Sequence, residues 1–323
     1  MRSRKKLSEI SRRILTNIIM IFSLMITASI NYQKVSADDQ NTIPIAMSLD
    51  DNYTYPTIVA MTSILENAKE ETKYDFYMLV PGEFRKSNRE KIMKLKDRYK
   101  NCEINIINMR KKFKELNSDY RITTPAYYRL ALPMILPKQV EKIIYLDGDT
   151  IVTEDLTAMF NINMSKYYIA AIPDYRHLYL SMFLRDTTKE ICSGVMLMNI
   201  GKMRKDKFNR KVSDFIRNNR YRLYMHDQTV LNVVCYGHIK MLPLKYGILR
   251  SMMCKPNRAY ATSNLRYHYS LAEIKKTKKN HAIIHYTGRK PWVVKKLRAG
   301  NVWWKYAKKC YLWNEIKAKY KYY

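Results

Sequence analysis

Between residues 43 and 107 the sequence alternates between strand-like and helix-like segments, and this alternation constrains the fold more than any other feature. Apolar, strand-like segments cover 43–47, 74–80 and 103–107, and amphipathic helices are expected at 55–68 and 86–98. Consecutive strands joined by helical crossovers lie parallel. We therefore expect an α/β chain with a Rossmann-like, mainly parallel sheet flanked by helices.

Acidic residues stand where several of these strands end. Asp50-Asp51-Asn52-Tyr53 follows the first strand, Asp147-Gly148-Asp149 follows an apolar strand at 142–146, and Asp174 follows one at 169–173. In sheets of this kind, ligands bind beyond the carboxyl ends of the strands. No GxGxxG sequence follows the first strand, so a nicotinamide dinucleotide site has no support.

Asp147 and Asp149 are candidate metal ligands. Gly148 lets the backbone turn tightly, so that both carboxylates can face one point. Mg²⁺ and Mn²⁺ commonly use one or two carboxylates together with the phosphates of a substrate. The alternative is that the two acids only cap the next segment or form an Asx-turn. The Asp-Gly-Asp sequence alone leaves both interpretations open.

The charge of the chain favours anionic partners. Its 323 residues include 59 Lys plus Arg against 28 Asp plus Glu, a formal net charge of +31. Such a charge attracts nucleotide phosphates, acidic lipid head groups or nucleic acid. The basic residues are spread along the chain without an RNA or DNA motif, so we expect no nucleic-acid partner. Five scattered cysteines without a CxxC pair support neither a zinc ribbon nor a disulfide framework.

The N-terminus has the pattern of a secretory signal peptide or an uncleaved signal anchor. Basic residues precede an apolar run at 14–30, and Val35-Ser36-Ala37 resembles a cleavage site. At 17 residues, with several polar side chains, the run is a marginal spanning helix. We expect residues 1–41 to lie outside the folded domain. The protein would be membrane-associated through the anchor, or secreted if cleaved after Ala37, and the side of the membrane stays open.

The second half adds a buried strand at 194–199, a helix opened by His226-Asp227-Gln228, and a closing block at 285–292, His-Tyr-Thr-Gly-Arg-Lys-Pro-Trp. A tail at 296–323 follows, in which Trp and Tyr alternate with Lys. Such a tail suits a helix lying on an anionic membrane surface. It equally suits a helix packed on the domain with a solvated basic face, and both interpretations stay open.

With the Asp-Gly-Asp turn and the 285–292 block both in view, the chain resembles glycosyltransferase family 8, in particular the bacterial galactosyl- and glucosyltransferases of lipopolysaccharide synthesis. The resemblance covers roughly residues 43–292. It rests on five segments in the family's order: 50–53, 124–130, 145–150, 193–199, and Asp227-Gln228 with the 285–292 block.

The resemblance implies a GT-A fold in residues 42–295. It also implies retaining transfer of a hexose, galactose or glucose, from a UDP-sugar to a glycan, glycolipid or protein acceptor. The cofactor it implies is Mn²⁺, with Mg²⁺ as the alternative. The chemistry agrees, because a divalent ion neutralises the diphosphate of a leaving UDP without proton transfer. One imidazole among oxygen ligands shifts the preference from Mg²⁺ toward Mn²⁺.

Carried onto this sequence, the family pattern assigns three groups of residues. The metal ligands would be Asp147, Asp149 and His285. The sugar nucleotide would meet Asp50 and Asn52 at the uridine, Tyr53 stacked on uracil, and Arg129, Asp147, Gly288 and Lys290 near the diphosphate. The catalytic group of Asp174, Asp227 and Gln228 would hold the hydroxyls of the transferred sugar. The family is usually described as using a front-face mechanism, and an amide such as that of Gln228 is a poor nucleophile.

Three of these residues also have purely structural interpretations. Arg129 could form a structural ion pair, Lys290 could be one solvated lysine among many, and His285 could be a core histidine. A catalytically altered secreted or surface sugar-binding relative is the alternative function, and the intact Asp147, Asp149 and His285 argue against it.

The sequence departs from the family pattern at two places. Only Arg289 stands between Gly288 and Lys290, where two residues are common, and Cys192 stands where Asn is frequent. Arg289 could therefore take over the phosphate contact of Lys290. Both departures concern the donor and leave the metal ligands intact. The sequence does not name the donor sugar, the acceptor or the linkage.

Overall fold

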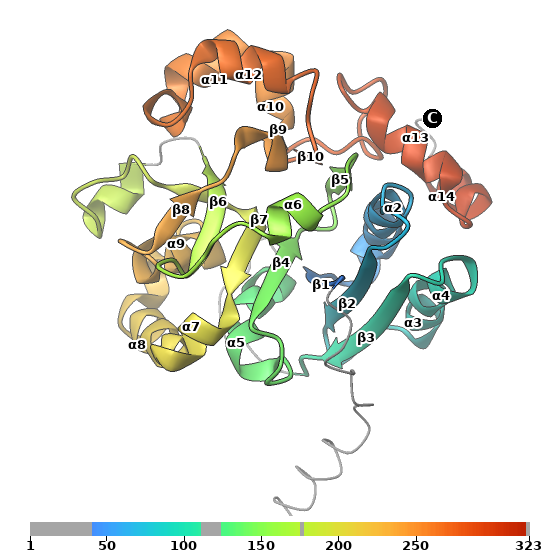
Figure 1. Ribbon diagram of the computed structural model, residues 1–323, viewed down its shortest axis with the longest axis horizontal. Coiled ribbons are helices and arrows are strands. Elements are labelled where there is room, and N and C mark those ends of the chain that lie inside the picture. Colours follow the sequence, from blue (N-terminus) through green and yellow to red (C-terminus); the bar gives the residue numbers. More distant parts are fainter. Residues whose placement is uncertain (1–40, 111–123, 175–177, 321–323) are drawn as a thin grey trace, which may run out of the picture. The chain divides into compact units, whose positions relative to one another are not determined.

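The computed structural model describes residues 41–110, 124–174 and 178–320 (Figure 1). The first half contains the alternation expected from the sequence: β1 Thr42–Ser48, α2 Thr54–Leu65, β2 Lys73–Val80, α3 Lys86–Met93, α4 Leu95–Arg98 and β3 Cys102–Asn108. The structure differs in two details. The helix expected at 55–68 ends at Leu65, and the helix expected at 86–98 is divided at Lys94 into α3 and α4.

The central sheet has seven strands in the order β3-β2-β1-β4-β7-β6-β8 (Figure 1). Its later strands are β4 Lys142–Leu146, β6 Ile169–Pro173, β7 Ile191–Asn199 and β8 Ile239–Met241. β7 runs antiparallel to both of its neighbours, β4 and β6, and the other neighbouring pairs are parallel. The expected mixed, mainly parallel α/β sheet is therefore confirmed.

Helices and 3-10 helices flank the sheet and connect its strands (Figure 1). In the described residues beyond the first half they are η2 Thr124–Ala131, α5 Leu132–Ile135, α6 Thr157–Phe160, η3 Leu178–Met182, α7 Ile200–Lys205, α8 Phe208–Asn219, η4 Arg220–Arg222, α9 His226–Val234, η5 Leu244–Tyr246, α10 Arg250–Cys254, α11 Pro256–Thr262, η6 Asn264–Tyr267, α12 Leu271–Thr277, α13 Asn301–Lys309 and α14 Trp313–Lys319.

Buried side chains divide between the two faces of the central sheet. Along β1, Ile45 and Met47 join one hydrophobic cluster while Ala46 joins the other. The same alternation sends Ile144 to the first cluster and Tyr145 to the second. Successive residues of a strand point to opposite faces. Strands buried on both faces read as continuous apolar runs, which is why these strands are recognisable in the sequence.

A second, three-stranded sheet joins segments that are far apart in the sequence. It pairs β10 Ile283–His285 antiparallel with β5 Thr150–Val152 and parallel with β9 Ile248–Leu249. Its register sets His285 opposite Thr150, and the Tyr286 N–H donates to the Asp149 carbonyl at 3.0 Å. This small sheet therefore brings the closing block next to the Asp-Gly-Asp turn.

The C-terminal tail packs on the domain. α13 lies against α2 (Figure 1), and Trp303, Leu312 and Ile316 are buried in the same cluster as α2. Lysines of the two tail helices are exposed at positions 305, 308, 317 and 319. Of the two interpretations of the tail, the structure therefore shows the packed helices with a solvated basic face.

The predicted signal peptide or anchor covers residues 1–41, of which 1–40 lie outside the described residues. Within the ranges that the structure describes, no helix combines the length and the apolar character needed to cross a membrane.

Candidate functional site

Asp147 and Asp149 lie in the turn between β4 and β5, at the carboxyl end of β4. The Asp147 N–H donates to the Gly194 carbonyl at 2.8 Å, and the Thr150 hydroxyl donates to the Asp147 carbonyl at 2.8 Å. A Cβ on Gly148 would lie 2.3 Å from Thr57 Oγ1, too close for any other residue without rearrangement. The glycine in this turn therefore permits close packing against α2.

Asp147, Asp149 and His285 offer ligand atoms that all lie within 4.8 Å of one another. Nε2 of His285 is 3.1 Å from Asp149 Oδ1 and 3.7 Å from Asp147 Oδ2. Asp149 Oδ1 is buried and accepts no hydrogen bond of normal geometry from a described residue. The positive charge of His285 compensates this oxygen in the structure, and a bound cation would replace that charge.

Gly194 on β7 keeps the space beside this cluster open. A Cβ there would lie 2.1 Å from Cε1 of His285 and 2.6 Å from Asp147 Oδ2. Two carboxylates and one imidazole form a donor set suited to Mg²⁺ or Mn²⁺. The residues present therefore fit a divalent cation, and the predicted ligands are brought together.

The charges of Asp149, His285 and Lys290 stabilise one another. Burial alone would raise the pKa of Asp149, but the positive charges of Lys290 and His285 hold it well below its usual value. Burial lowers the pKa of His285, and the Asp149 carboxylate outweighs this effect and raises it well above its usual value. On its other side, Nδ1 of His285 lies 3.6 Å from the buried Cys192 sulfur.

Lys290 reaches the metal-ligand cluster despite the shortened block. Its ammonium pairs with Asp149 Oδ2 and donates to the Tyr286 carbonyl at 2.9 Å. The chain turns between Tyr286 and Lys290 at Gly288, whose φ of 72° lies in the left-handed region that favours glycine. Arg289 is exposed. The structure therefore places Lys290, and not Arg289, beside the candidate metal ligands.

Arg129, in η2, is buried and joins two of the predicted site acids. Its Nη2 donates to Asp147 Oδ1 at 2.8 Å, and its Nε lies 3.2 Å from Asp227 Oδ2. Its guanidinium also lies 4.3 Å from the centre of the Tyr145 ring. Burial lowers the pKa of Arg129, but the carboxylates of Asp147 and Asp227 outweigh this effect and raise the pKa above its ordinary value. The structural ion pair considered from the sequence is therefore present, and it lies within the site.

Asp174, Asp227 and Gln228 are brought together around Ser193. The Gln228 amide donates to Asp174 Oδ2 at 2.9 Å, and its carbonyl oxygen accepts from the Ser193 N–H at 3.2 Å. The Ser193 hydroxyl donates to Asp227 Oδ2 at 2.9 Å. Burial raises the pKa of Asp227, with Arg129 opposing the change. Sequence reasoning included Ser193 only as part of a family segment, without assigning it to the site.

His226 sets the start of α9, which carries Asp227 and Gln228. Its backbone φ is 53°, an uncommon value for a residue with a side chain. Its Nδ1 is hydrogen-bonded to the Tyr127 hydroxyl at 2.9 Å. Such backbone conformations persist where the surroundings hold them, often at functional sites. Nothing in the sequence singles out this residue beyond its position before Asp227.

The residues that follow β1 lie beside the same turn. Asp50 Oδ1 accepts hydrogen bonds from the backbone of Asn52 and Tyr53 at 3.0 and 3.1 Å, so it caps the 3-10 helix η1 Asp51–Tyr53. Tyr53 packs against Gly148, whose added Cβ would lie 3.3 Å from Tyr53 Cδ1. Burial, together with the nearby Asp149 carboxylate, raises the pKa of the Tyr53 hydroxyl. The base-binding roles of Asp50, Asn52 and Tyr53 stay predictions.

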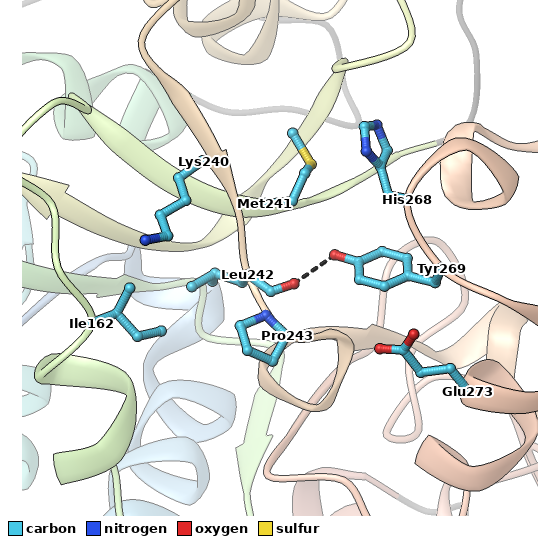
Figure 2. Close-up of a pocket in the computed structure, with 8 residues that line it drawn as sticks. All are labelled: Ile162, Lys240, Met241, Leu242, Pro243, His268, Tyr269 and Glu273. Atoms are coloured by element: carbon cyan, nitrogen blue, oxygen red, sulfur yellow. Dashed lines mark hydrogen bonds between the residues drawn. The ribbon is translucent and has the colours of Figure 1, made fainter.

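The structure also contains a largely apolar groove of about 530 Å³, whose lining side chains are drawn in Figure 2. It is lined by the segment from Lys240 to Pro243, by Tyr269 and by Glu273 of α12, and the Tyr269 hydroxyl donates to the Leu242 carbonyl at 2.5 Å. None of the predicted site residues lines it.

Comparisons with known proteins agree with this geometry. The sequence profile of glycosyl transferase family 8 matches residues 44–295. General stress protein A of Bacillus subtilis (strain 168) is 28% identical over 257 residues, which are 77% of this chain and 86% of that protein. A lipopolysaccharide 1,2-glucosyltransferase of Escherichia coli is 23% identical over 266 residues, which are 80% of this chain and 75% of that protein.

Among solved structures, the chain is similar to the galactosyltransferase LgtC in complex with donor and acceptor sugar analogues. The TM-score is 0.69 at 22% identity, and the match covers 85% of this chain and 100% of that one. At this identity the likeness shows a shared fold, so the expected GT-A fold is confirmed.

Proposed function

The chain belongs to glycosyl transferase family 8, and from this premise we propose that it transfers a hexose from a UDP-sugar to an acceptor, with retention of configuration and with Mn²⁺ bound. The donor would carry glucose or galactose, and the acceptor would be a glycan, a glycolipid or a protein. The observation that carries the proposal is the group of Asp147, Asp149 and His285, whose ligand atoms lie within 4.8 Å of one another beside the space that Gly194 leaves open.

When bound, a divalent cation neutralises the diphosphate of the leaving nucleotide. Asp147, Asp149 and His285 would hold it. Lys290 pairs with Asp149 in the structure and would supply a further positive charge for the phosphates. Arg129 holds Asp147 through one nitrogen and Asp227 through another, so it fixes the distance between the phosphate side and the sugar side of the site.

On the sugar side, Asp174 and Asp227 would accept hydrogen bonds from the hydroxyls of the transferred hexose, and the Gln228 amide could donate as well as accept. Asp227 is engaged by Arg129 and Ser193, and the Gln228 amide is a poor nucleophile. These contacts favour a binding role for the group and support a front-face mechanism, in which the acceptor hydroxyl enters on the side of the leaving diphosphate.

The proposal is tested by incubating the full chain with Mn²⁺ and a panel of UDP-sugars and measuring UDP release. A matched panel of GDP-sugars controls for the base. We expect release from UDP-glucose or UDP-galactose that stops when a chelator is added and returns with Mn²⁺. Binding of UDP-sugars without release, with or without candidate acceptors, would favour the alternative of a non-catalytic sugar-binding relative. Absence of both binding and release would contradict the proposal.

We further propose that the basic face of the tail attracts an anionic membrane surface. The exposed lysines of α13 and α14 support this, since basic residues near an acidic leaflet contribute about 1 kcal/mol each. The tail aromatics Trp303 and Tyr306 are buried in the domain, so the attraction would be electrostatic. Co-sedimentation with anionic vesicles that is lost at high salt and in a variant with Lys305, Lys308, Lys317 and Lys319 changed to Gln would support it, and unchanged sedimentation of that variant would contradict it.

A further inference from the structure

Four aromatic rings connect the candidate donor site to the C-terminal helices. Tyr53 meets Trp292 at a centroid distance of 6.0 Å with the rings perpendicular. Trp292 in turn lies 5.0 Å from Trp303 and 6.4 Å from Tyr320, and Trp303 lies 6.3 Å from Tyr320. These separations are those of favourable edge-to-face and tilted aromatic pairs. We call these four residues the aromatic cluster.

The tail contributes two residues of the aromatic cluster, Trp303 and Tyr320, and both are held by further contacts. Trp303 is fully buried in α13 where that helix packs on α2. Tyr320, at the end of α14, also meets the ring of Tyr55 at 6.4 Å. The Tyr55 hydroxyl donates to Glu315 of α14 at 2.8 Å. Since Tyr55 lies two residues after Tyr53, the tail contacts the Tyr53 segment directly as well as through Trp292.

At the other end of the cluster, Tyr53 and Trp292 border the groups assigned to the nucleotide. Tyr53 packs on Gly148, between the two candidate metal ligands. Trp292 follows Lys290 in the turn whose Val293 and Val294 N–H groups donate to the Lys290 carbonyl at 3.1 and 3.0 Å. A shift of Trp292 would therefore move both the tyrosine assigned to the base and the lysine assigned to the phosphates.

We propose that the C-terminal helices position Tyr53 for the nucleotide base, with Tyr320 and Trp303 acting through Trp292. This inference rests on the proposed function, in which Tyr53 contacts the base of a uridine nucleotide. Tyr320 and Trp303 are positioning residues, because they touch Trp292 and not the candidate metal or sugar groups. The tail thereby has a role in donor affinity in addition to its contribution to the core.

The tail also offers a matched control. Trp313, at the start of α14, meets Trp304 at 6.4 Å, and Trp304 meets Trp303 at 4.8 Å. Trp313 and Tyr320 are both half-buried aromatic residues of one short helix segment. Replacing either removes packing from the tail. Among the described residues, the ring of Tyr320 meets Trp292, whereas the ring of Trp313 meets Trp304.

The experiment measures the dissociation constant of the full-length protein for UDP in the presence of Mn²⁺ by titration calorimetry. The variants are Tyr53→Ala, Tyr320→Ala, Trp313→Ala and the double variant of Tyr53 and Tyr320. Thermal unfolding of each variant and its Mn²⁺ affinity, measured by electron paramagnetic resonance, report folding and the metal site separately. Tyr320→Leu replaces Tyr320→Ala if the alanine variant does not fold.

We expect Tyr53→Ala to raise the dissociation constant for UDP about tenfold, as for loss of a base-stacking aromatic residue. Tyr320→Ala should raise it by about three- to tenfold, which lies within the roughly two- to thirtyfold range of effects transmitted through intermediate contacts. Mn²⁺ affinity should not change. Trp313→Ala should leave UDP binding unchanged, even if it lowers the unfolding temperature as much as Tyr320→Ala does. In the Tyr53→Ala background, Tyr320→Ala should have no further effect on UDP binding.

Three results would overturn the inference while leaving the proposed function intact: unchanged UDP binding in Tyr320→Ala, an equal loss in Trp313→Ala, or full additivity in the double variant. Absence of UDP binding by the unchanged protein would instead contradict the proposed function and, with it, this inference. Unchanged binding in Tyr53→Ala would overturn the inference by removing the base-contacting role of Tyr53, while UDP release by the unchanged protein would still support the transfer reaction.

Discussion

The Cys192 sulfur lies 3.6 Å from Nδ1 of His285, so the thiol contacts the nitrogen that points away from the carboxylates. The opposite nitrogen, Nε2, lies 3.1 Å from Asp149 Oδ1. A histidine that binds a metal through one ring nitrogen usually donates a hydrogen bond from the other, and this partner fixes the orientation of the ring. Here the partner is a thiol where the family often has Asn, and a sulfur atom is a weak acceptor.

We expect Cys192→Ala to raise the dissociation constant for Mn²⁺ about tenfold, because the imidazole loses the partner that holds its orientation. Cys192→Ser, which keeps a polar atom of similar size, should bind Mn²⁺ nearly as tightly as the unchanged protein. The measurement is Mn²⁺ titration followed by electron paramagnetic resonance. Equal affinity of the alanine variant and the unchanged protein would show that Cys192 does not orient the ligand.

Asp149→Asn should abolish Mn²⁺ binding and metal-dependent UDP release, because it removes the charge from the carboxylate that lies nearest His285. It also leaves the Lys290 ammonium without its acidic partner, and loss of one member of a largely buried pair costs roughly 3 kcal/mol of unfolding free energy. Urea unfolding and Mn²⁺ titration give the two quantities separately.

Lys290→Gln is the matched control for that substitution, since it breaks the same ion pair and keeps all three candidate metal ligands. It should retain Mn²⁺ binding and weaken UDP binding. A folded Asp149→Asn variant with near-normal Mn²⁺-dependent release would refute the assignment of the metal ligands.

The sheet and the acids at its strand ends could be predicted because each depends on local sequence. Most residues of β1, β2 and β4 are apolar, and Asp147 and Asp149 follow β4 directly. The small sheet could not be predicted in this way. β9 and β10 have two and three residues, too few for a periodic pattern, yet the pairing of β10 with β5 brings His285 to Asp149. His285 was found only through the family resemblance.

Two other features depend on tertiary packing that no local pattern records. The contact between Cys192 and His285 requires β7 and β10 to converge, and the uncommon backbone angle of His226 requires its hydrogen bond to Tyr127. The tail illustrates a different limit. Alternating aromatic and basic residues give the same pattern whether Trp303 enters a membrane or, as the structure has it, the protein core.

Gly288→Ala should weaken UDP binding by displacing Lys290. The residue has a φ of 72°, and an added Cβ would meet nothing within 4 Å, so the only effect is on the backbone. A left-handed conformation costs a residue with a side chain about 1–2 kcal/mol, and the chain would relax toward a different turn. Calorimetric titration with UDP gives the change in affinity, and thermal unfolding gives the change in stability.

Gly237→Ala provides the control for that change. Gly237 has a φ of 79° and equally open surroundings, and it lies in the turn between α9 and β8. We expect a similar loss of stability with unchanged UDP affinity. Similar UDP affinities in the two variants would show that the turn at Gly288 does not set the position of Lys290.

The attachment of the tail should weaken in acid. Glu66 binds Lys309 at 2.7 Å and accepts from the Tyr99 hydroxyl at 2.6 Å. Burial raises the pKa of Glu66, but these partners outweigh it and hold the pKa below its ordinary value of 4.5. Because the pKa is lower in the folded state, the carboxylate stabilises the fold above the unfolded-state pKa. That stabilisation is lost as the pH falls through the folded-state pKa.

We therefore expect Glu66→Gln to lower the free energy of unfolding by about 0.5–1 kcal/mol at pH 7, the upper range for partly exposed ion pairs. The difference between this variant and the unchanged protein should shrink steadily below pH 4.5. Urea unfolding at pH 7, 5 and 3.5 measures it. Glu70→Gln, which changes an exposed carboxylate on the same loop, should show no comparable difference at pH 7. If the difference in unfolding free energy between Glu66→Gln and the unchanged protein stayed constant from pH 7 to 3.5, the effect would come from altered packing of the side chain. It would then not come from the charge that holds the tail to α2.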